Sequence, residues 1–168
     1  TDGTVAVNGV NLYYQRSGTS GLPLVCIPGS MGTAETDFGP QLASLSDEMQ
    51  VVSFDPRGYG KSRPPRRMFP LDFYQQDADD AAALMKALGH EEYGVVGWSD
   101  GAISAVMLAA SQQAAARKLV IFGGNGYFSQ ADVDAFESLR DVEATWSKRM
   151  KATHKPVYGD DLQPMWSS

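Results

Sequence analysis

The sequence is dominated by short apolar runs that alternate with longer stretches of helical periodicity. Each run is bounded by turn residues and predicts a strand, and the segments between the later runs have the apolar spacing of helices. Apolar strands that follow one another through helices are typical of a parallel sheet covered on both faces. The runs are "PLVCIPG", "MQVVSFD", "YGVVGW" and "KLVIFGG", and helices are expected over about 37–45, 72–88, 102–116 and from 130 onward.

Two further segments carry local predictions. In "VAVNGVNLYYQ", Asn8-Gly9 lies between two alternating runs, which predicts a β-hairpin with a type I′ turn. The segment from Pro56 to Pro70 is rich in proline and predicts a loop, and its basic cluster, Arg63 to Arg67, is expected to be exposed. With the hairpin included, the sheet should hold roughly six strands.

Composition and charge exclude several classes of function. The 168 residues suffice for one ordinary domain, and 43% hydrophobic with 20% charged residues suits a globular protein. The net charge of −6 argues against nucleic acid as a partner, because no excess of cations is present to displace phosphate counterions. No apolar stretch approaches the roughly 20 residues of a membrane span, so no membrane partner is expected. Neither histidine has a ligand partner at helical spacing, so no metal and no other cofactor is expected.

The cysteine content and the N-terminus bear on location. Cys26 is the only cysteine and lies in an apolar run, which predicts a buried core residue rather than a reactive thiol. A single cysteine is consistent with a reducing compartment, and the N-terminus has no signal-peptide pattern. The chain starts with Thr1 rather than Met, as it would after removal of a presequence. An intracellular location, mitochondrial or cytoplasmic, is expected.

The motif that points to chemistry is Gly97-Trp98-Ser99-Asp100-Gly101, which follows a predicted strand and precedes a predicted helix. A strand-to-helix turn of this kind forces the serine into a strained conformation, and glycines flank it because a Cβ would collide there. The hydroxyl of Ser99 would then project from the sheet as a nucleophile, beside the free N–H groups of the helix. The alternative is a glycine-bounded turn in which Ser99 only caps the helix.

A second loop is placed to complete an oxyanion hole. "IPGSMG", residues 27–32, follows an earlier strand. Gly29 and Gly32 would let the backbone approach a substrate, with the N–H of Ser30 or Met31 pointing inward. An ordinary glycine turn is the alternative for this loop.

The segments "VNGVNLYYQRSG", "IPGSMG", "DPRGYGKSRPP" and "GWSDG" have the order and spacing found in α/β-hydrolases. Over essentially its whole length the chain resembles, within that superfamily, the valacyclovir hydrolase (biphenyl hydrolase-like) proteins. The resemblance implies a serine esterase that hydrolyses small α-amino acid esters through a Ser99 acyl-enzyme. It also implies that the Asp100 N–H and that of Ser30 or Met31 form the oxyanion hole. The Asp100 carboxylate would pair with the substrate's α-ammonium group, or would only favour the helix dipole.

The sequence does not supply a complete catalytic triad. In this fold an acid and then a histidine follow the serine along the chain. His90 precedes Ser99 and is expected on the surface near the opposite end of its strand, and His154 follows only 55 residues later, too early for the family's histidine. The resemblance therefore implies a hydrolase truncated before the last strands, with residues 1–128 as the N-terminal part of the core and 129–168 as the start of a helical cap. A complementary C-terminal chain or fragment would supply the histidine and the acid.

Several neighbouring side chains have expected roles. Tyr127 and Phe128 follow a strand end, so they are candidates to line the substrate pocket or to be core aromatics. Asp55 and Arg57 are expected to fix the loop after their strand rather than to touch substrate. The alternative to an esterase is a catalytically inactive hydrolase-like chain that binds a ligand or partner without turnover.

Overall fold

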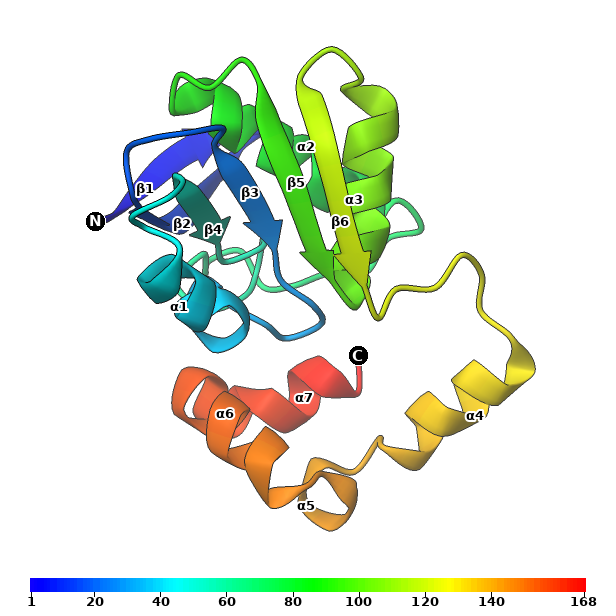
Figure 1. The fold of residues 1–168 in the computed structure, drawn as a ribbon. Helices are drawn as coiled ribbons and strands as arrows, with labels where there is room; N and C mark the ends of the chain where they lie inside the picture. Colours follow the sequence, from blue (N-terminus) through cyan, green and yellow to red (C-terminus); the bar gives the residue numbers. More distant parts are fainter. The chain divides into compact units, whose positions relative to one another are not determined.

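The computed structural model describes residues 1–168 and contains a six-stranded sheet with helices on both faces (Figure 1). The strands are β1 (Asp2–Val7), β2 (Val10–Ser17), β3 (Leu24–Ile27), β4 (Val51–Phe54), β5 (Tyr93–Trp98) and β6 (Ala116–Phe122). They lie in the order β1-β2-β4-β3-β5-β6. The β1–β2 and β2–β4 pairs are antiparallel, and the β3–β4, β3–β5 and β5–β6 pairs are parallel. The predicted mostly parallel sheet with flanking helices is confirmed.

Three helices connect the strands, and two of them differ from the predicted bounds. They are α1 (Ala34–Ser44), α2 (Phe73–Ala87) and α3 (Asp100–Ser111). α1 begins earlier than expected because Thr33 and Thr36 form a reciprocal capping box, with hydrogen bonds of 2.8 and 3.1 Å. α3 ends earlier than expected because Ala116 pairs with Tyr93 in the sheet. Strand pairing there outweighs the helix propensity of the alanines.

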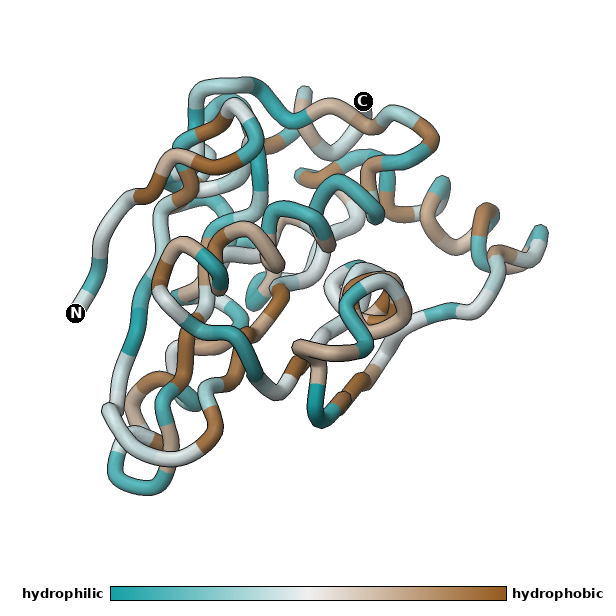
Figure 2. Tube along the Cα trace, turned by 90° about the horizontal axis from the view of Figure 1, so that it is seen from above, coloured by the Kyte–Doolittle hydropathy of each residue, from teal (hydrophilic) through white to brown (hydrophobic).

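Side chains that alternate along the strands pack against different helices on the two faces. On one face Val25 and Ile27 pack in a cluster that includes Leu108 of α3 and residues of α2. On the other face Cys26 packs with Phe38 of α1. Cys26 is buried, which confirms the predicted core cysteine. Because of this burial, the pKa of its thiol is raised to about 12. Hydrophobic and hydrophilic residues both occur along the helices (Figure 2). This is expected of helices that pack one face on a sheet and expose the other to solvent.

The hairpin and the proline-rich segment follow the predictions with one exception. Asn8 and Gly9 have φ values of 46° and 78°, as a type I′ turn requires. The segment from residue 56 to 70 forms no helix or strand. Within it, however, Arg67 is buried, and its guanidinium donates to both carboxylate oxygens of Asp77 on α2, at 2.7 and 2.6 Å. The expectation of an exposed cluster is wrong for Arg67 because this buried acid pairs with it.

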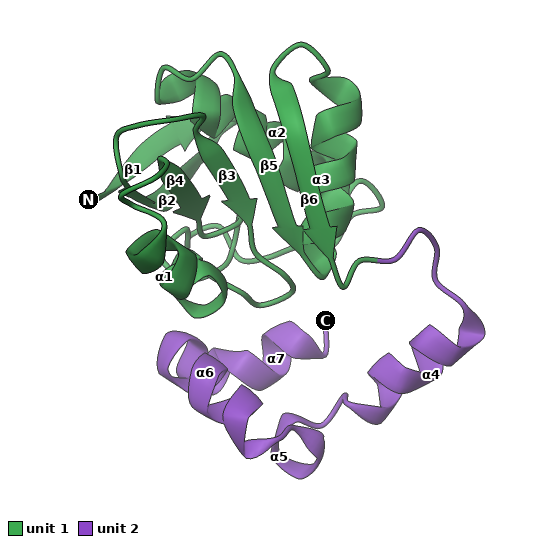
Figure 3. Cartoon of the chain, viewed as in Figure 1, with its two compact units in different colours: residues 1–124 green, residues 125–168 purple.

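The chain divides into two units, residues 1–124 and 125–168 (Figure 3). Unit 2 holds α4 (Gln130–Ser138), α5 (Val142–Thr145), α6 (Lys148–Tyr158), a 3-10 turn (Gly159–Asp161) and α7 (Leu162–Trp166). Its indole rings Trp146 and Trp166 pack edge-on at 5.0 Å and both donate to the Leu139 carbonyl oxygen. The assignment of this region to a helical cap stays a prediction. None of the chain's helices has both the length and the apolar character that crossing a membrane requires.

Removing one partner of the Arg67–Asp77 pair should strongly destabilise unit 1. Asp77→Ala leaves the Arg67 guanidinium buried without its partner, and we expect a loss of about 3–5 kcal/mol in the free energy of unfolding. Asp79→Ala, on the exposed side of the same helix, is the matched control and should cost less than about 0.5 kcal/mol. Urea unfolding followed by circular dichroism measures both, and equal losses would contradict the role of the ion pair.

Candidate active site

Ser99 occupies the turn between β5 and α3 in a strained backbone conformation. Its φ is 54° and its ψ is −123°, a combination that L-residues rarely adopt. Its N–H donates to the Phe122 carbonyl oxygen at 3.0 Å, which ties the turn to the end of β6. Ser99 stands at the N-cap position of α3, but its side chain makes no capping hydrogen bond. The interpretation of Ser99 as a helix cap is therefore wrong, and its hydroxyl is not used by the helix.

Close packing of α3 on the sheet explains the glycines on either side of Ser99. A Cβ at Gly97 would lie 2.6 Å from the Cα of Ala102. A Cβ at Gly101 would collide with the carbonyl oxygens of Ile27 and Pro28. Both contacts are shorter than real Cβ atoms show, so only glycine fits at either position. The steric reason expected from the sequence is confirmed.

The loop after β3 reaches Ser99 because of the strand register. Ile27 pairs with Gly97 in the parallel β3–β5 ladder, so the two strands end at the same edge of the sheet. A Cβ at Gly29 would lie 3.0 Å from the Cβ of Ser99. Gly32 serves a different purpose from the one expected, because a Cβ there would collide with the Asp37 carboxylate rather than face a substrate. Asp37 accepts the Gly29 N–H at 2.9 Å and holds the loop in place.

The two candidate oxyanion donors in this loop differ in their surroundings. Gly32 donates to the Gly29 carbonyl oxygen at 3.0 Å, which makes Ser30 and Met31 the central residues of a turn. Met31 is buried and has a φ of 59°. Burial raises the pKa of the Tyr59 hydroxyl, and the Ser30 side chain and the Met31 backbone act against that rise.

Asp100 lies directly beside the nucleophile candidate, and other side chains hold its carboxylate. The Tyr74 hydroxyl of α2 donates to Asp100 Oδ1 at 3.1 Å. Burial raises the pKa of the Asp100 carboxyl, and nearby Asp77 raises it further. The hydrogen bond from Tyr74, the positive charge of Arg67 and the Ser30 side chain lower this pKa. Neither Tyr74 nor Arg67 was expected at this site from the sequence.

Asp55 and Arg57 fix the loop after β4, as predicted. The Asp55 carboxylate accepts the backbone N–H of Ala34 at 2.9 Å and that of Lys61 at 2.7 Å. Arg57 donates to both carboxylate oxygens of Asp80 on α2 at 2.9 Å. Both residues are held by other parts of the protein rather than aimed at Ser99.

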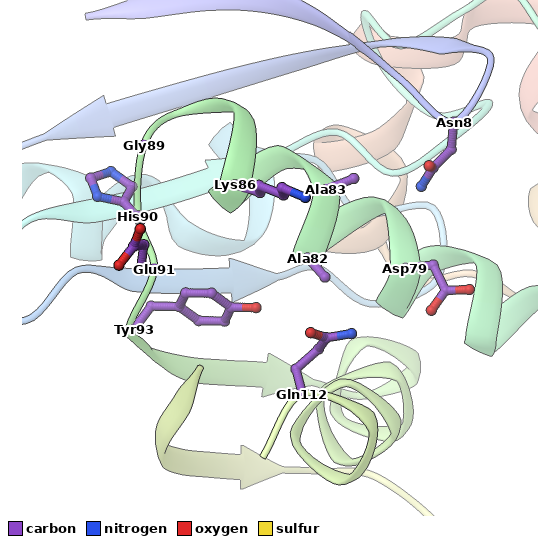
Figure 4. A pocket seen from close by; sticks show the side chains of 10 residues that line it. All are labelled: Asn8, Asp79, Ala82, Ala83, Lys86, Gly89, His90, Glu91, Tyr93 and Gln112. Atoms are coloured by element: carbon purple, nitrogen blue, oxygen red, sulfur yellow. The ribbon is translucent and has the colours of Figure 1, made fainter. Parts of the chain in front are cut away.

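The two histidines lie in different units. His90 shares unit 1 with Ser99 but does not lie near it, and His154 belongs to unit 2. His90 precedes β5 and is separated from Ser99 by the length of that strand, roughly 20 Å, so its predicted position is confirmed. It lines a cavity of about 810 Å³ with residues such as Lys86 and Tyr93, at the end of the sheet away from Ser99 (Figure 4). His154 lies on α6, in unit 2, where its Nδ1 contacts the Met150 carbonyl oxygen at 2.9 Å instead of a carboxylate.

Other predicted features fall outside the Ser99 turn. Tyr127 and Phe128 belong to unit 2, where the Phe128 ring lies 6.4 Å from that of Phe136. Their part in a substrate pocket stays a prediction. The structure brings no group of three or more His, Cys, Asp or Glu side chains into an arrangement that could hold a metal ion.

Known proteins share both the sequence and the fold. Residues 23–164 match the family described as alpha/beta hydrolase fold. The chain is 46% identical to serine hydrolase BPHL of Homo sapiens over 162 residues, which cover 96% of this chain and 55% of that protein. The Mus musculus protein of the same name is 45% identical over the same share of each chain. The chain thus spans about half the length of the curated relatives it matches.

Solved structures agree on the fold. Epoxide hydrolase CorEH superposes with a TM-score of 0.75 at 21% identity, over 99% of this chain and 70% of that one. The enol-lactonase from Burkholderia xenovorans LB400 superposes with a TM-score of 0.76 at 21% identity, over 98% and 70%. The resemblance predicted from the motifs is confirmed: the chain belongs to the α/β-hydrolase fold family and is a close relative of the serine hydrolase BPHL.

Proposed function

We propose that this chain is the nucleophile-bearing part of a serine hydrolase that acts on small α-amino acid esters. The observation that carries the proposal is the strained Ser99, whose hydroxyl caps no helix and stands at the carboxyl edge of the parallel sheet. Strain of this kind persists only where the surrounding packing imposes it, and it is concentrated at active sites. Ester specificity is supported by the family resemblance and by the charge beside Ser99.

The reaction would be acyl transfer. The Ser99 oxygen attacks the ester carbonyl carbon, and the carbonyl oxygen becomes an oxyanion held by backbone N–H groups. One donor is the Asp100 N–H in the first turn of α3, where helix N–H groups lack internal partners. The second is the N–H of Ser30 or Met31, the central residues of the turn after β3. The alcohol leaves with a proton, and water then releases the acid from Ser99.

The charges around Asp100 favour a cationic substrate. Arg67 carries one positive charge, and Asp77 and Asp100 carry one negative charge each when ionised. Because Arg67 already pairs with both oxygens of Asp77, Asp100 has no cation of its own in direct contact. An α-ammonium group would neutralise the remaining carboxylate through a charge-assisted hydrogen bond.

The base and its acid would come from residues outside this chain, brought next to Ser99 by a complementary C-terminal chain or fragment. β6 offers a place for it because the strand lies at the edge of the sheet and its residues Leu119, Val120, Ile121 and Phe122 are exposed. An apolar, unpaired edge strand is a template for a further strand. A new strand parallel to β6 would end at the same edge of the sheet as β5. The loop after it would then lie at the edge that carries the Ser99 turn.

A chain that binds a ligand without turnover is the second candidate. It is favoured by the position of His90, which stands at the opposite end of β5 from Ser99. Mixing experiments with the C-terminal half of a full-length relative distinguish the two candidates, since only an esterase gains turnover from the missing base.

Ser99→Ala should abolish turnover of an activated amino acid ester. We expect no hydrolysis by this chain alone, hydrolysis after mixing with the complementary half, and a loss of at least about 1,000-fold in the Ser99→Ala mixture. Release of the alcohol measured by absorbance follows the reaction. Ser111→Ala, at the far end of α3, is the matched control and should retain activity. Persistent hydrolysis in the Ser99→Ala mixture would reject the acyl-enzyme.

Asp100→Asn should remove the preference for amines. We expect binding of an amino acid ester to weaken about 10- to 100-fold, and binding of the same ester without its amine to stay nearly unchanged. Calorimetric titration of both esters measures this. An equal effect on the two esters would restrict Asp100 to a structural role.

The amine preference should also depend on pH. Burial raises the pKa of the Asp100 carboxyl, so the preference is lost as the pH falls through that raised value and the group becomes neutral. It is lost again above about pH 7.7, where a substrate α-amino group loses its proton. The ratio of the two affinities, measured between pH 4 and 9 by titration, should therefore pass through a maximum, and a flat profile would contradict ion pairing.

A further inference from the structure

We propose that Tyr74 is a positioning residue for substrate recognition: its hydroxyl holds the Asp100 carboxylate in the orientation that receives the substrate ammonium. The inference rests on the proposed function and adds a residue that no motif contains. It starts from the 3.1 Å hydrogen bond from the Tyr74 hydroxyl to Asp100 Oδ1, which joins α2 to the first turn of α3.

The Asp100 carboxylate is held by a donor from another element. The Tyr74 hydroxyl approaches it from α2, at 3.1 Å. A carboxylate has about four lone-pair sites, so this donor leaves room for a bidentate or single contact with a ligand. The hydrogen bond restricts the rotation of the carboxylate before a ligand arrives, and such preorganisation lowers the entropic cost of binding.

Tyr74 is suited to act as a permanent donor. Burial raises the pKa of its hydroxyl, and the charge of Asp100 raises it further, so the phenol stays protonated. Its ring packs against that of Phe73, with ring centroids 3.9 Å apart and the planes tilted by 35°. A neutral hydroxyl can hold the carboxylate without cancelling its charge, whereas a cationic partner would compete with the substrate ammonium.

The remaining charged groups near Asp100 are already engaged. Arg67 is held by Asp77 through two short hydrogen bonds and by the Arg57 carbonyl oxygen at 3.0 Å. Its guanidinium also lies 4.6 Å from the centre of the Tyr59 ring. Arg67 therefore moderates the electrostatic potential at Asp100 from a distance, and Tyr74 is the group that sets the direction of the carboxylate.

The same geometry links recognition to catalysis. Asp100 directly follows Ser99, and a Cβ at Gly29, in the loop that carries the proposed second oxyanion donor, would lie 3.0 Å from the Ser99 Cβ. Loss of Tyr74 should affect amine-bearing ligands first, because the direct contact with the ammonium is the one that depends on the carboxylate orientation.

The test compares Tyr74→Phe with Tyr93→Phe, which removes a hydroxyl from the opposite end of β5. Calorimetric titration of the 168-residue chain uses an amino acid benzyl ester and the same ester without its amine. Tyr74→Phe should weaken binding of the amino ester about tenfold and of the other ester less than about twofold. Tyr93→Phe should leave both affinities unchanged. Equal weakening of both esters in Tyr74→Phe would overturn the proposal.

A carboxyl titration provides a readout that a purely structural role would not move. With ¹³C-labelled aspartate, the Asp100 pKa should rise further in Tyr74→Phe, because a hydrogen bond that favours the ionised form is lost. An unchanged Asp100 pKa would overturn the proposal. If Tyr74→Phe does not fold, 3,5-difluorotyrosine at position 74 replaces it; this more acidic donor should lower the Asp100 pKa, and no change would count against the proposal.

Failure of this inference differs from failure of the proposed function. If the amine preference is absent in the unmodified chain or survives in Asp100→Asn, the recognition role of Asp100 is wrong. If the preference disappears in Asp100→Asn but persists in Tyr74→Phe, only the role of Tyr74 is wrong.

Discussion

The close contact between α3 and the sheet is the constraint on which the site depends. No Cβ fits at Gly97 or Gly101, so β5 passes into α3 within a turn that forces Ser99 to a φ of 54°. The same contact places Asp100 in the first turn of the helix, against the loop after β3. Strain at Ser99 costs of order 1–3 kcal/mol. It is sustained because β5 pairs with both β3 and β6 and because α3 buries its apolar side on the sheet.

Buried charges organise the loops around that turn. Asp55 joins the start of α1 to the loop after β4, and Arg67 joins that loop to Asp77 of α2. Each carboxylate satisfies groups that are distant in sequence, and a buried charge without such partners would be strongly unfavourable. α2 is consequently held by two contacts: the ion pair between Arg67 and Asp77, and the hydrogen bond from Tyr74 to Asp100. The result is a fixed carboxylate beside Ser99, with its neighbouring positive charge already paired.

The sequence predicted what depends on local patterns. Strand order along the chain, the Asn8-Gly9 turn and the Ser99 motif are set by short-range periodicity and sterics, and each was found as expected. Tyr74 and Arg67 could not be placed, because their roles depend on which loop meets which helix. Asp77 did carry a signal: it stands four residues before Ala81 and seven before Leu84, so an acid occupied the apolar stripe of a helix. The early end of α3 was missed because sheet pairing overrides propensity.

Under the proposed function, substrate recognition and proton transfer would be separable. Ser99, the loop after β3, Asp100 and Tyr74 all lie in unit 1, and their geometry is imposed by the sheet and its helices without help from a histidine. A base next to Ser99 would change the nucleophilicity of the hydroxyl, but it would not be needed to create the turn, the oxyanion donors or the oriented carboxylate. Under the proposed function, the selectivity for an ammonium group would therefore be set within unit 1, and turnover would require the base as well.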